Sequence, residues 1–251
     1  ERGLKFWDDL ADTYSGFQQG DMPGRTVEYL VRKGIVSAAT DVLEVGSGPG
    51  TYSLPLAEKA RSVTCVETSP RMLSRLKQRA AERGLTNLVL LNVDFRDLPP
   101  GTGSGAVVSA LCPGTGSAEG LARMEAHTAD WCVHIMWIEN RADDLSAQIW
   151  QKLGKNYSFE GRRQGLVAEH LTAMGRNYEE TEMECCVSQE LPLEDAVEKE
   201  VVSFGAYGLT AGVEDAVRAV LEPLAEDGVL YLRNSNRMRV IVWRKGEADR
   251  C

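Results

Sequence analysis

A glycine-rich segment after a short apolar run is the clearest candidate for ligand binding in this chain. Residues 41–45 are mostly apolar, and Gly46, Gly48 and Gly50 follow them directly. Glycine lets the backbone turn sharply and approach a bound molecule closely. Because an apolar run bounded by glycine is typical of a buried strand, the segment predicts a strand, a tight binding loop and a helix.

Acidic residues stand where three successive apolar runs end. Glu44 precedes the glycine loop, Glu67 ends the second run and Asp94 ends the third. Open α/β sheets bind ligands at the carboxyl ends of their strands, where an acid can accept hydrogen bonds from both hydroxyls of a ribose. Asp94 could accept the adenine amino hydrogen, with Phe95 packed on the ring. The pattern predicts an adenosine compound.

The charge at Glu44 distinguishes between adenosine cofactors. A carboxylate there would repel a pyrophosphate and suits a ligand with a positive amino group. S-adenosylmethionine carries an ammonium and a sulfonium and has no phosphate. A nicotinamide cofactor, the alternative, prefers the pattern G-x-G-x-x-G, whose third glycine is Thr51 here. We therefore expect S-adenosylmethionine.

Strand-like and helix-like segments alternate through the first half of the chain. Strands are expected at 41–45, 63–66, 88–93, 106–111 and 131–138, with helices between most of them. Ser69 and Pro70 fit an N-cap and first-turn proline, and Gly84 fits the end of that helix. Such alternation predicts a parallel sheet with helices on both faces.

The pattern loosens after Glu139. Residues 139–163 are polar and irregular, so no element is expected there. Helices are expected near 4–14, 25–33, 165–174, 193–207 and 213–224, and further strands at 183–191 and 239–243.

The glycine loop, Glu67 and Asp94-Phe95 resemble the class I S-adenosylmethionine methyltransferases, in particular the small-molecule group often labelled type 11 or type 25. Residues 6–14 resemble the N-terminal segment of that family, whose tyrosine often closes over the cofactor. The resemblance extends from Phe6 to about Ile138. It implies a Rossmann-like α/β fold: a seven-stranded, mostly parallel sheet with helices on both faces and a helical lid.

One methyltransferase domain is expected over residues 1–251. It comprises an N-terminal helical segment (1–35), a cofactor-binding core (36–138) and a substrate and lid region with the last strands (139–251). The expected cofactor-binding residues lie in the loop, at the strand ends and in the N-terminal segment. They are Tyr14, Glu44, Gly46, Ser47, Gly48, Gly50, Glu67, Thr68, Met72, Asp94, Phe95 and Cys112.

The end of the fourth strand bears on the methyl acceptor. It reads Leu-Cys-Pro-Gly-Thr from Leu111, which is not the Asn-Pro-Pro-Tyr type of many nucleic-acid and protein amide methyltransferases. The formal net charge of −9 disfavours nucleic acid as a partner. We expect a small-molecule acceptor. A cofactor-binding module without catalysis, acting in a complex, is the alternative.

No catalytic residue is predicted. Methyl transfer depends on proximity and alignment, and a general base is needed only if the acceptor must lose a proton. His127, His134 and His170 are more typical of structural histidines, and Cys112 is a hypothetical wall of the acceptor pocket. No metal site is expected, because the cysteine spacings include no CxxC pair.

The surroundings of the protein are also predicted from composition. No apolar run approaches the roughly 20 residues that span a bilayer, and the cysteines fit a reducing, cytoplasmic setting. A homodimer is compatible with the sequence. The basic residues of the helix after Ser69 are expected to form a solvated face. They are Arg71, Arg75, Lys77, Arg79 and Arg83.

Overall fold

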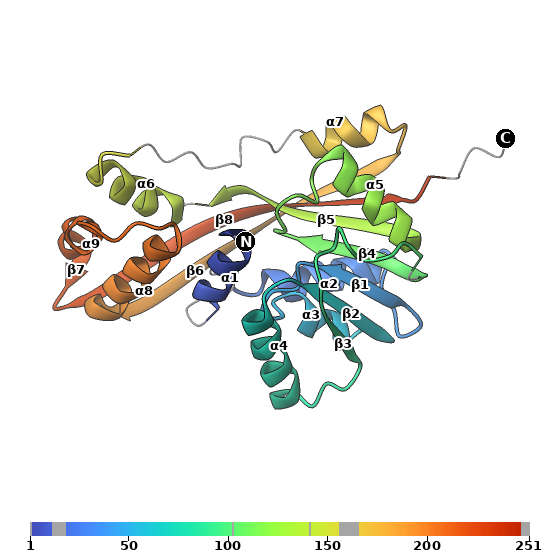
Figure 1. Cartoon of the computed structure of the whole chain (residues 1–251), viewed down its shortest axis with the longest axis horizontal. Coiled ribbons are helices and arrows are strands. Elements are labelled where there is room, and N and C mark those ends of the chain that lie inside the picture. The colour runs from blue at the N-terminus through green and yellow to red at the C-terminus, as the bar shows by residue number, and fades with distance from the viewer. Residues whose placement is uncertain (1, 12–18, 102, 141, 156–165, 247–251) are drawn as a thin grey trace.

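The computed structural model describes residues 2–11, 19–101, 103–140, 142–155 and 166–246. Its centre is an eight-stranded sheet with the order β3-β2-β1-β4-β5-β8-β6, and the short β7 pairs with β8 (Figure 1). The parallel strands are β1 (Asp41–Val45), β2 (Ser62–Glu67), β3 (Leu88–Asn92), β4 (Ser104–Ala110) and β5 (Thr128–Asn140). The strands in antiparallel pairs are β6 (Tyr178–Pro192), β7 (Ala225–Glu226) and β8 (Val229–Arg244).

The predicted count of seven strands is wrong by one. The extra strand, β7, is only two residues long and folds back on the start of β8. The parallel part of the sheet is as expected, but every pair that β8 makes is antiparallel, so the sheet is mixed. Five parallel strands still end at one edge, which is where the acidic residues were expected.

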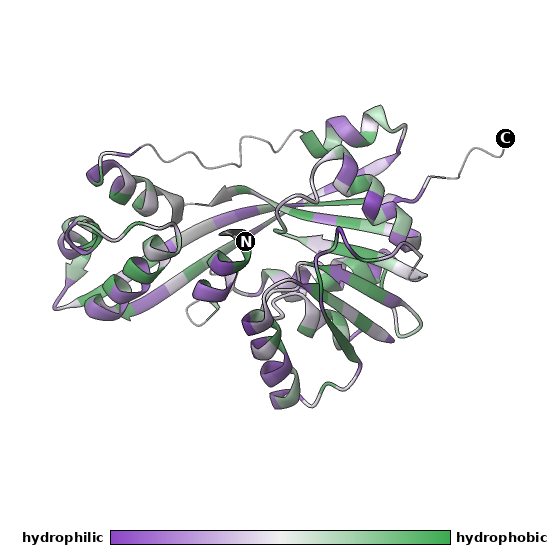
Figure 2. Cartoon of the chain, viewed as in Figure 1, coloured by the Kyte–Doolittle hydropathy of each residue, from purple (hydrophilic) through white to green (hydrophobic). Residues whose placement is uncertain are grey.

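Helices cover both faces of the sheet, as predicted. Side chains alternate along a strand, so Val42 packs with one set of helices and Leu43 with the other. The first face is covered by α2 (Met22–Arg32), α3 (Ser53–Ala57) and α4 (Pro70–Glu82), and the second by α5 (Ala118–His127) and α7 (Leu166–Ala173). Figure 2 shows hydrophobic central strands and a largely hydrophilic α4.

The start of α4 follows from local sequence. Ser69 is the N-cap, and its hydroxyl accepts a hydrogen bond from the backbone N–H of Met72 at 3.1 Å. Pro70 occupies the first turn, where no N–H is required. Gly84 adopts a φ of +66° just after the helix. These observations confirm the predicted helix boundaries.

The second half of the chain differs most from expectation. β6 and β8 have 15 and 16 residues, so both are longer than predicted, and they extend beyond the parallel strands (Figure 1). The sequence pattern did not predict this length, because both strands contain many charged residues. In the structure, these residues form ion pairs between the two strands. Arg237 and Arg239 of β8 both pair with Glu182 of β6.

A second hydrophobic cluster forms on this extension. It joins α6 (Ala142–Lys152), α8 (Leu193–Ala206) and α9 (Val213–Leu221), with Ile149, Phe204 and Val217 among its buried side chains. The prediction of an irregular segment over 139–163 is wrong where α6 lies. That helix is stabilised by long-range packing of Ile149, which no local pattern signals.

The N-terminal helix connects the two halves. α1 (Arg2–Leu10) places Leu10 against Met72 of α4, and Ala206 of α8 packs on the same cluster. The Ser69 hydroxyl donates to Asp8 at 2.5 Å.

No helix within the described residues is long and apolar enough to cross a bilayer.

A buried ion pair should contribute strongly to stability. Glu125 of α5 is 7% exposed and accepts hydrogen bonds from Arg176 Nε at 2.8 Å and from Trp243 Nε1 at 2.9 Å. Glu125→Gln replaces the anion beside the Arg176 guanidinium with a neutral amide, so we expect the free energy of unfolding in urea to fall by about 3 kcal/mol. The matched control is Glu214→Gln in an exposed pair with Arg218, which should cost less than about 1 kcal/mol. Equal losses in the two variants would contradict this account.

Candidate functional site

A cavity of about 680 Å³ lies at the edge where the parallel strands β1 to β4 end. Leu4 and Trp7 of α1 line one side, and the N-terminal turns of α5 line another. Eight of the predicted residues lie on its wall. They are Gly46, Gly48, Glu67, Thr68, Met72, Asp94, Phe95 and Cys112. The sheet topology therefore brings together residues that are far apart in the sequence, such as Gly46 and Cys112.

Three of the predicted residues that the structure describes are not on this wall. Glu44, Ser47 and Gly50 are buried beside the loop and do not line the cavity. Tyr14 lies outside the described residues. The first three shape the loop from within, so their predicted role in direct contact with a ligand does not follow from the geometry.

The three glycines of the loop serve different purposes. Gly46 has a φ of +71°, and a Cβ there would lie 2.6 Å from Cys112 Sγ. Gly50 has a φ of +90°, and its Cβ would lie 2.4 Å from Leu76 Cδ1. Gly48 has a φ of +51° with no atom within 4 Å of a Cβ, so it faces open space. Two glycines permit close packing, and the third presents its backbone to the cavity.

Glu67 holds the open side of the loop. Its carboxylate accepts the backbone N–H of Gly48 and that of Ser69, each at 2.9 Å. The residue is 8% exposed, so this charge is largely shielded from water. A pyrophosphate bound to the Gly48 amide would sit against the carboxylate and be repelled. The loop therefore suits a ligand without phosphate.

Glu44 lies behind the loop and is 1% exposed. The Ser53 hydroxyl donates a hydrogen bond to its carboxyl group. Burial raises the pKa of Glu44 to about 8, and repulsion by Glu67 adds to the rise. The carboxyl is therefore mostly protonated at neutral pH, which corrects the expectation of a charged group facing the ligand.

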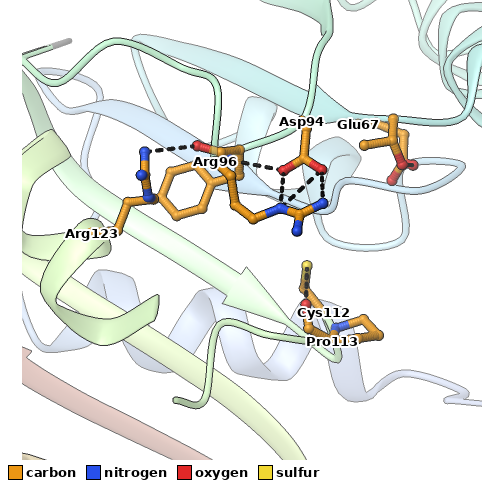
Figure 3. A network of polar contacts seen from close by, with 8 residues as sticks. Glu67, Asp94, Arg96, Cys112, Pro113 and Arg123 are labelled. Carbon is orange, nitrogen blue, oxygen red and sulfur yellow. Dashed lines mark hydrogen bonds and ion pairs between the residues drawn. The ribbon is translucent and has the colours of Figure 1, made fainter. Parts of the chain in front are cut away.

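Asp94 follows β3, which lies two strands from β1 in the sheet, and it lines the same cavity. It forms an ion pair with Arg96 at 2.6 Å, and these hydrogen bonds hold the pKa of Asp94 below its usual value (Figure 3). The Arg96 side chain is 81% exposed, so a ligand can displace it at small cost. Phe95 next to it is buried, and its ring centroid lies 5.1 Å from that of His127.

The turn after β4 forms another part of the cavity wall. Leu111 has a φ of +54°, which is unusual for a non-glycine residue and is found more often at functional sites. The Thr115 hydroxyl fixes the turn by donating to the Cys112 carbonyl at 2.8 Å. Burial, followed by repulsion from Glu67 and Asp94, raises the pKa of Cys112 to about 12. Its thiol, drawn in Figure 3, therefore stays neutral and lines the wall without acting as a nucleophile.

None of the three histidines lies on the cavity wall. His134 is 5% exposed in β5, and its Nε2 is 3.4 Å from the Thr115 hydroxyl. Burial lowers the pKa of His134 to about 4, so the ring is neutral. Within the described ranges, no group of three or more metal-binding side chains is clustered.

Sequence reasoning missed several residues on the wall. Trp7 and Arg96 lie close to segments that it had singled out, but nothing local indicated which way they point. Glu119 and Arg123 belong to α5, and Ser117 directly precedes that helix. The one available signal was Ser117, which caps the helix by accepting the Gly120 N–H at 3.1 Å.

The pKa of Glu44 predicts a pH-dependent stability difference. In the folded state its pKa is about 8 and its ordinary value is 4.5, so the folded state binds this proton more tightly. The stability that the protonated form confers is lost as the pH rises toward about 8. Glu44→Gln stays neutral, so its free energy of unfolding should increase relative to wild type between about pH 5 and 8. Urea unfolding of both proteins across this range measures the difference, and a constant difference would contradict the assignment.

The comparisons with known proteins agree with this geometry. Residues 42–113 match the family described as a methyltransferase domain. Ribosomal RNA small subunit methyltransferase A of Magnetococcus marinus is 32% identical over 121 residues, which are 47% of this chain and 43% of that protein. The matched segments thus span less than half the length of the first curated relatives.

Solved structures share the fold over most of the chain. The YcgJ protein from Bacillus subtilis has a TM-score of 0.56 at 12% identity, covering 89% of this chain and 99% of its own. Magnesium protoporphyrin IX methyltransferase from Synechocystis PCC 6803, solved with bound SAH, has a TM-score of 0.53 at 13% identity, covering 93% and 92%. Residues 42–113 therefore match a methyltransferase domain, and the chain shares its overall fold with these two solved structures.

Proposed function

We propose that this chain is an S-adenosylmethionine-dependent methyltransferase that acts on a small molecule. The observation that carries the proposal is the contact between the Glu67 carboxylate and the Gly48 amide at 2.9 Å, in a cavity that also contains Asp94. This arrangement fits an adenosine compound that is cationic and free of phosphate.

The chain offers a partner for each part of such a cofactor. Glu67 can accept hydrogen bonds from the ribose hydroxyls, and Asp94 can accept the adenine amino hydrogen once Arg96 moves aside. Met72, which is 2% exposed, supplies an apolar surface from α4. When bound, S-adenosylmethionine supplies a methyl group on a positively charged sulfur, from which it leaves readily.

The residues of the chain contribute alignment and exclusion of water. Gly46 keeps the turn after β4 close to the glycine loop, so Cys112 lines the cavity beside the loop and would help to position the cofactor there. Trp7 and Leu4 of α1 cover part of the cavity. The lid was expected within residues 139–251, but no described residue of that region lines the cavity, so α1 is our candidate for the lid instead. Such positioning can supply much of the acceleration of a displacement reaction, and the neutral thiol of Cys112 would not compete as an acceptor.

The acceptor class rests on charge and on the turn after β4. The net charge of −9 repels a phosphate backbone. The sequence Cys-Pro-Gly-Thr from Cys112 lacks the amide and aromatic side chains of the Asn-Pro-Pro-Tyr type. Ribosomal RNA is the second candidate, because curated relatives such as the one from Magnetococcus marinus are ribosomal RNA methyltransferases. A cofactor-binding module without catalysis is the third.

Loss of the acceptor at Glu67 should weaken cofactor binding. Glu67→Gln removes the negative charge that the ribose hydroxyls and the Gly48 amide share, so we expect the dissociation constant for S-adenosylhomocysteine to rise by about tenfold or more. Isothermal titration calorimetry measures it. The control, Glu214→Gln, lies on α9 and should bind like wild type. If Glu67→Gln bound S-adenosylhomocysteine as tightly as wild type, the proposed contact between Glu67 and the ribose hydroxyls would be wrong.

A methyl-transfer assay should separate the three candidate functions. Transfer from radiolabelled S-adenosylmethionine is measured against a panel of small metabolites and against ribosomal RNA in small subunits. We expect turnover with a small molecule, which should fall with Glu67→Gln. Turnover only with RNA would establish the second candidate. Cofactor binding without any turnover would favour the third.

A further inference from the structure

A second cavity, of about 440 Å³, lies on the other side of the glycine loop from the first. Its wall includes Pro49 and Thr51 of the loop segment, Gly20 and Gly24 near the start of α2, and one side of α4. None of these residues lines the first cavity. The proposed function therefore leaves this second cavity without a role.

The α4 side of this cavity is basic. Arg75, Arg79 and Arg83 follow one another at intervals of four residues, so they lie along one side of the helix, and all three line the cavity. Lys77 on the same helix is exposed and does not line it. The basic residues predicted to form one solvated face are thus divided between the solvent and a cavity.

Arg79 is partly buried on this side of the helix. Burial, followed by repulsion from Arg83 and Arg75, lowers its pKa. Its guanidinium donates to the Pro49 carbonyl at 2.7 Å, which is a neutral partner. A guanidinium has several N–H donors in a planar fork, so Arg79 keeps donors for an anion. Arg83 pairs with Glu58 at 3.3 Å, and both side chains are nearly half exposed.

A buried amide provides an independent sign of a missing ligand. Gln19 lines the cavity and is 3% exposed, and its Oε1 has no hydrogen-bond partner among the residues that the structure describes. A buried polar group without a partner is costly, so native proteins usually satisfy it. A hydrogen phosphate group carries both acceptor oxygens for arginine and a hydroxyl that can donate to Oε1.

We propose that this second cavity binds the phosphate group of a small phosphorylated molecule, with Arg79 and Arg83 as its charged ligands and Gln19 as its buried polar contact. The volume lies within the range of ordinary small-molecule sites. A small ligand fits better than a nucleic acid, because the net charge of −9 repels an extended phosphate backbone. The loop segment separates this anion site from the cavity that suits a cation.

Calorimetric titration with inorganic pyrophosphate tests the proposal on the full chain. Wild type should bind pyrophosphate saturably. Arg83→Met should weaken this binding by about tenfold, because a charge-assisted hydrogen bond is lost. Lys77→Met removes the same charge from the same helix outside the cavity and should bind like wild type. Gln19→Leu should also bind pyrophosphate more weakly, because leucine cannot accept a hydrogen bond from the ligand.

One further measurement makes the outcome decisive. Binding of S-adenosylhomocysteine to Arg83→Met should equal that of wild type, which shows that the variant is folded and that the first cavity is intact. Neither measurement needs turnover, so the site can fail while the proposed function stands. Absence of saturable pyrophosphate binding would overturn the proposal. Equal losses of pyrophosphate affinity in Lys77→Met and Arg83→Met would also overturn it. If the chain binds RNA and both variants weaken that binding equally, the arginines form a general basic surface, and the proposal fails as well.

Discussion

The close approach of Gly46 to Cys112 is the contact on which the candidate site depends. The turns after β1 and β4 meet there, and no side chain could stand at position 46 without moving the Cys112 sulfur. β1 and β4 are paired in parallel through the middle of the sheet, so their ends are fixed at one edge. The missing Cβ converts this edge into a continuous wall, along which Glu67 and Asp94 from the next two strands complete a cavity.

Charge is unevenly distributed on the two sides of the glycine loop. On one side, the Glu67 carboxylate occupies the Gly48 amide and Asp94 is held in its charged form by Arg96. On the other side, Arg79 holds the Pro49 carbonyl. Glu44 beneath the loop is mostly neutral, so it adds little charge to either side. The same short segment of backbone thus lies between a cavity with carboxylates on its wall and a cavity with three arginines on its wall.

The second half of the chain adds β6 and β8 to the sheet, and these two strands extend beyond the parallel strands (Figure 1). β8 inserts between β5 and β6, and the far ends of β6 and β8 support the cluster around Phe204. α1 packs against both α4 and Ala206 of α8, and its Trp7 lines the cavity. Methyltransferases with one cofactor site can accept different substrates by varying such peripheral elements, because the core strands alone fix the cofactor side.

Much of the site could be predicted from local sequence, since its signals are local. A strand followed by glycines, an acid at a strand end and a Ser-Pro helix start are each set by a few neighbouring residues, and Gly46, Glu67 and Asp94 were found in this way. Tertiary structure alone decided the rest. The length of β8 depends on ion pairs with β6, α6 depends on the burial of Ile149, and Glu44 is neutral because folding removes it from water. Pairing and desolvation arise between distant segments, so they leave no periodic pattern in the chain itself.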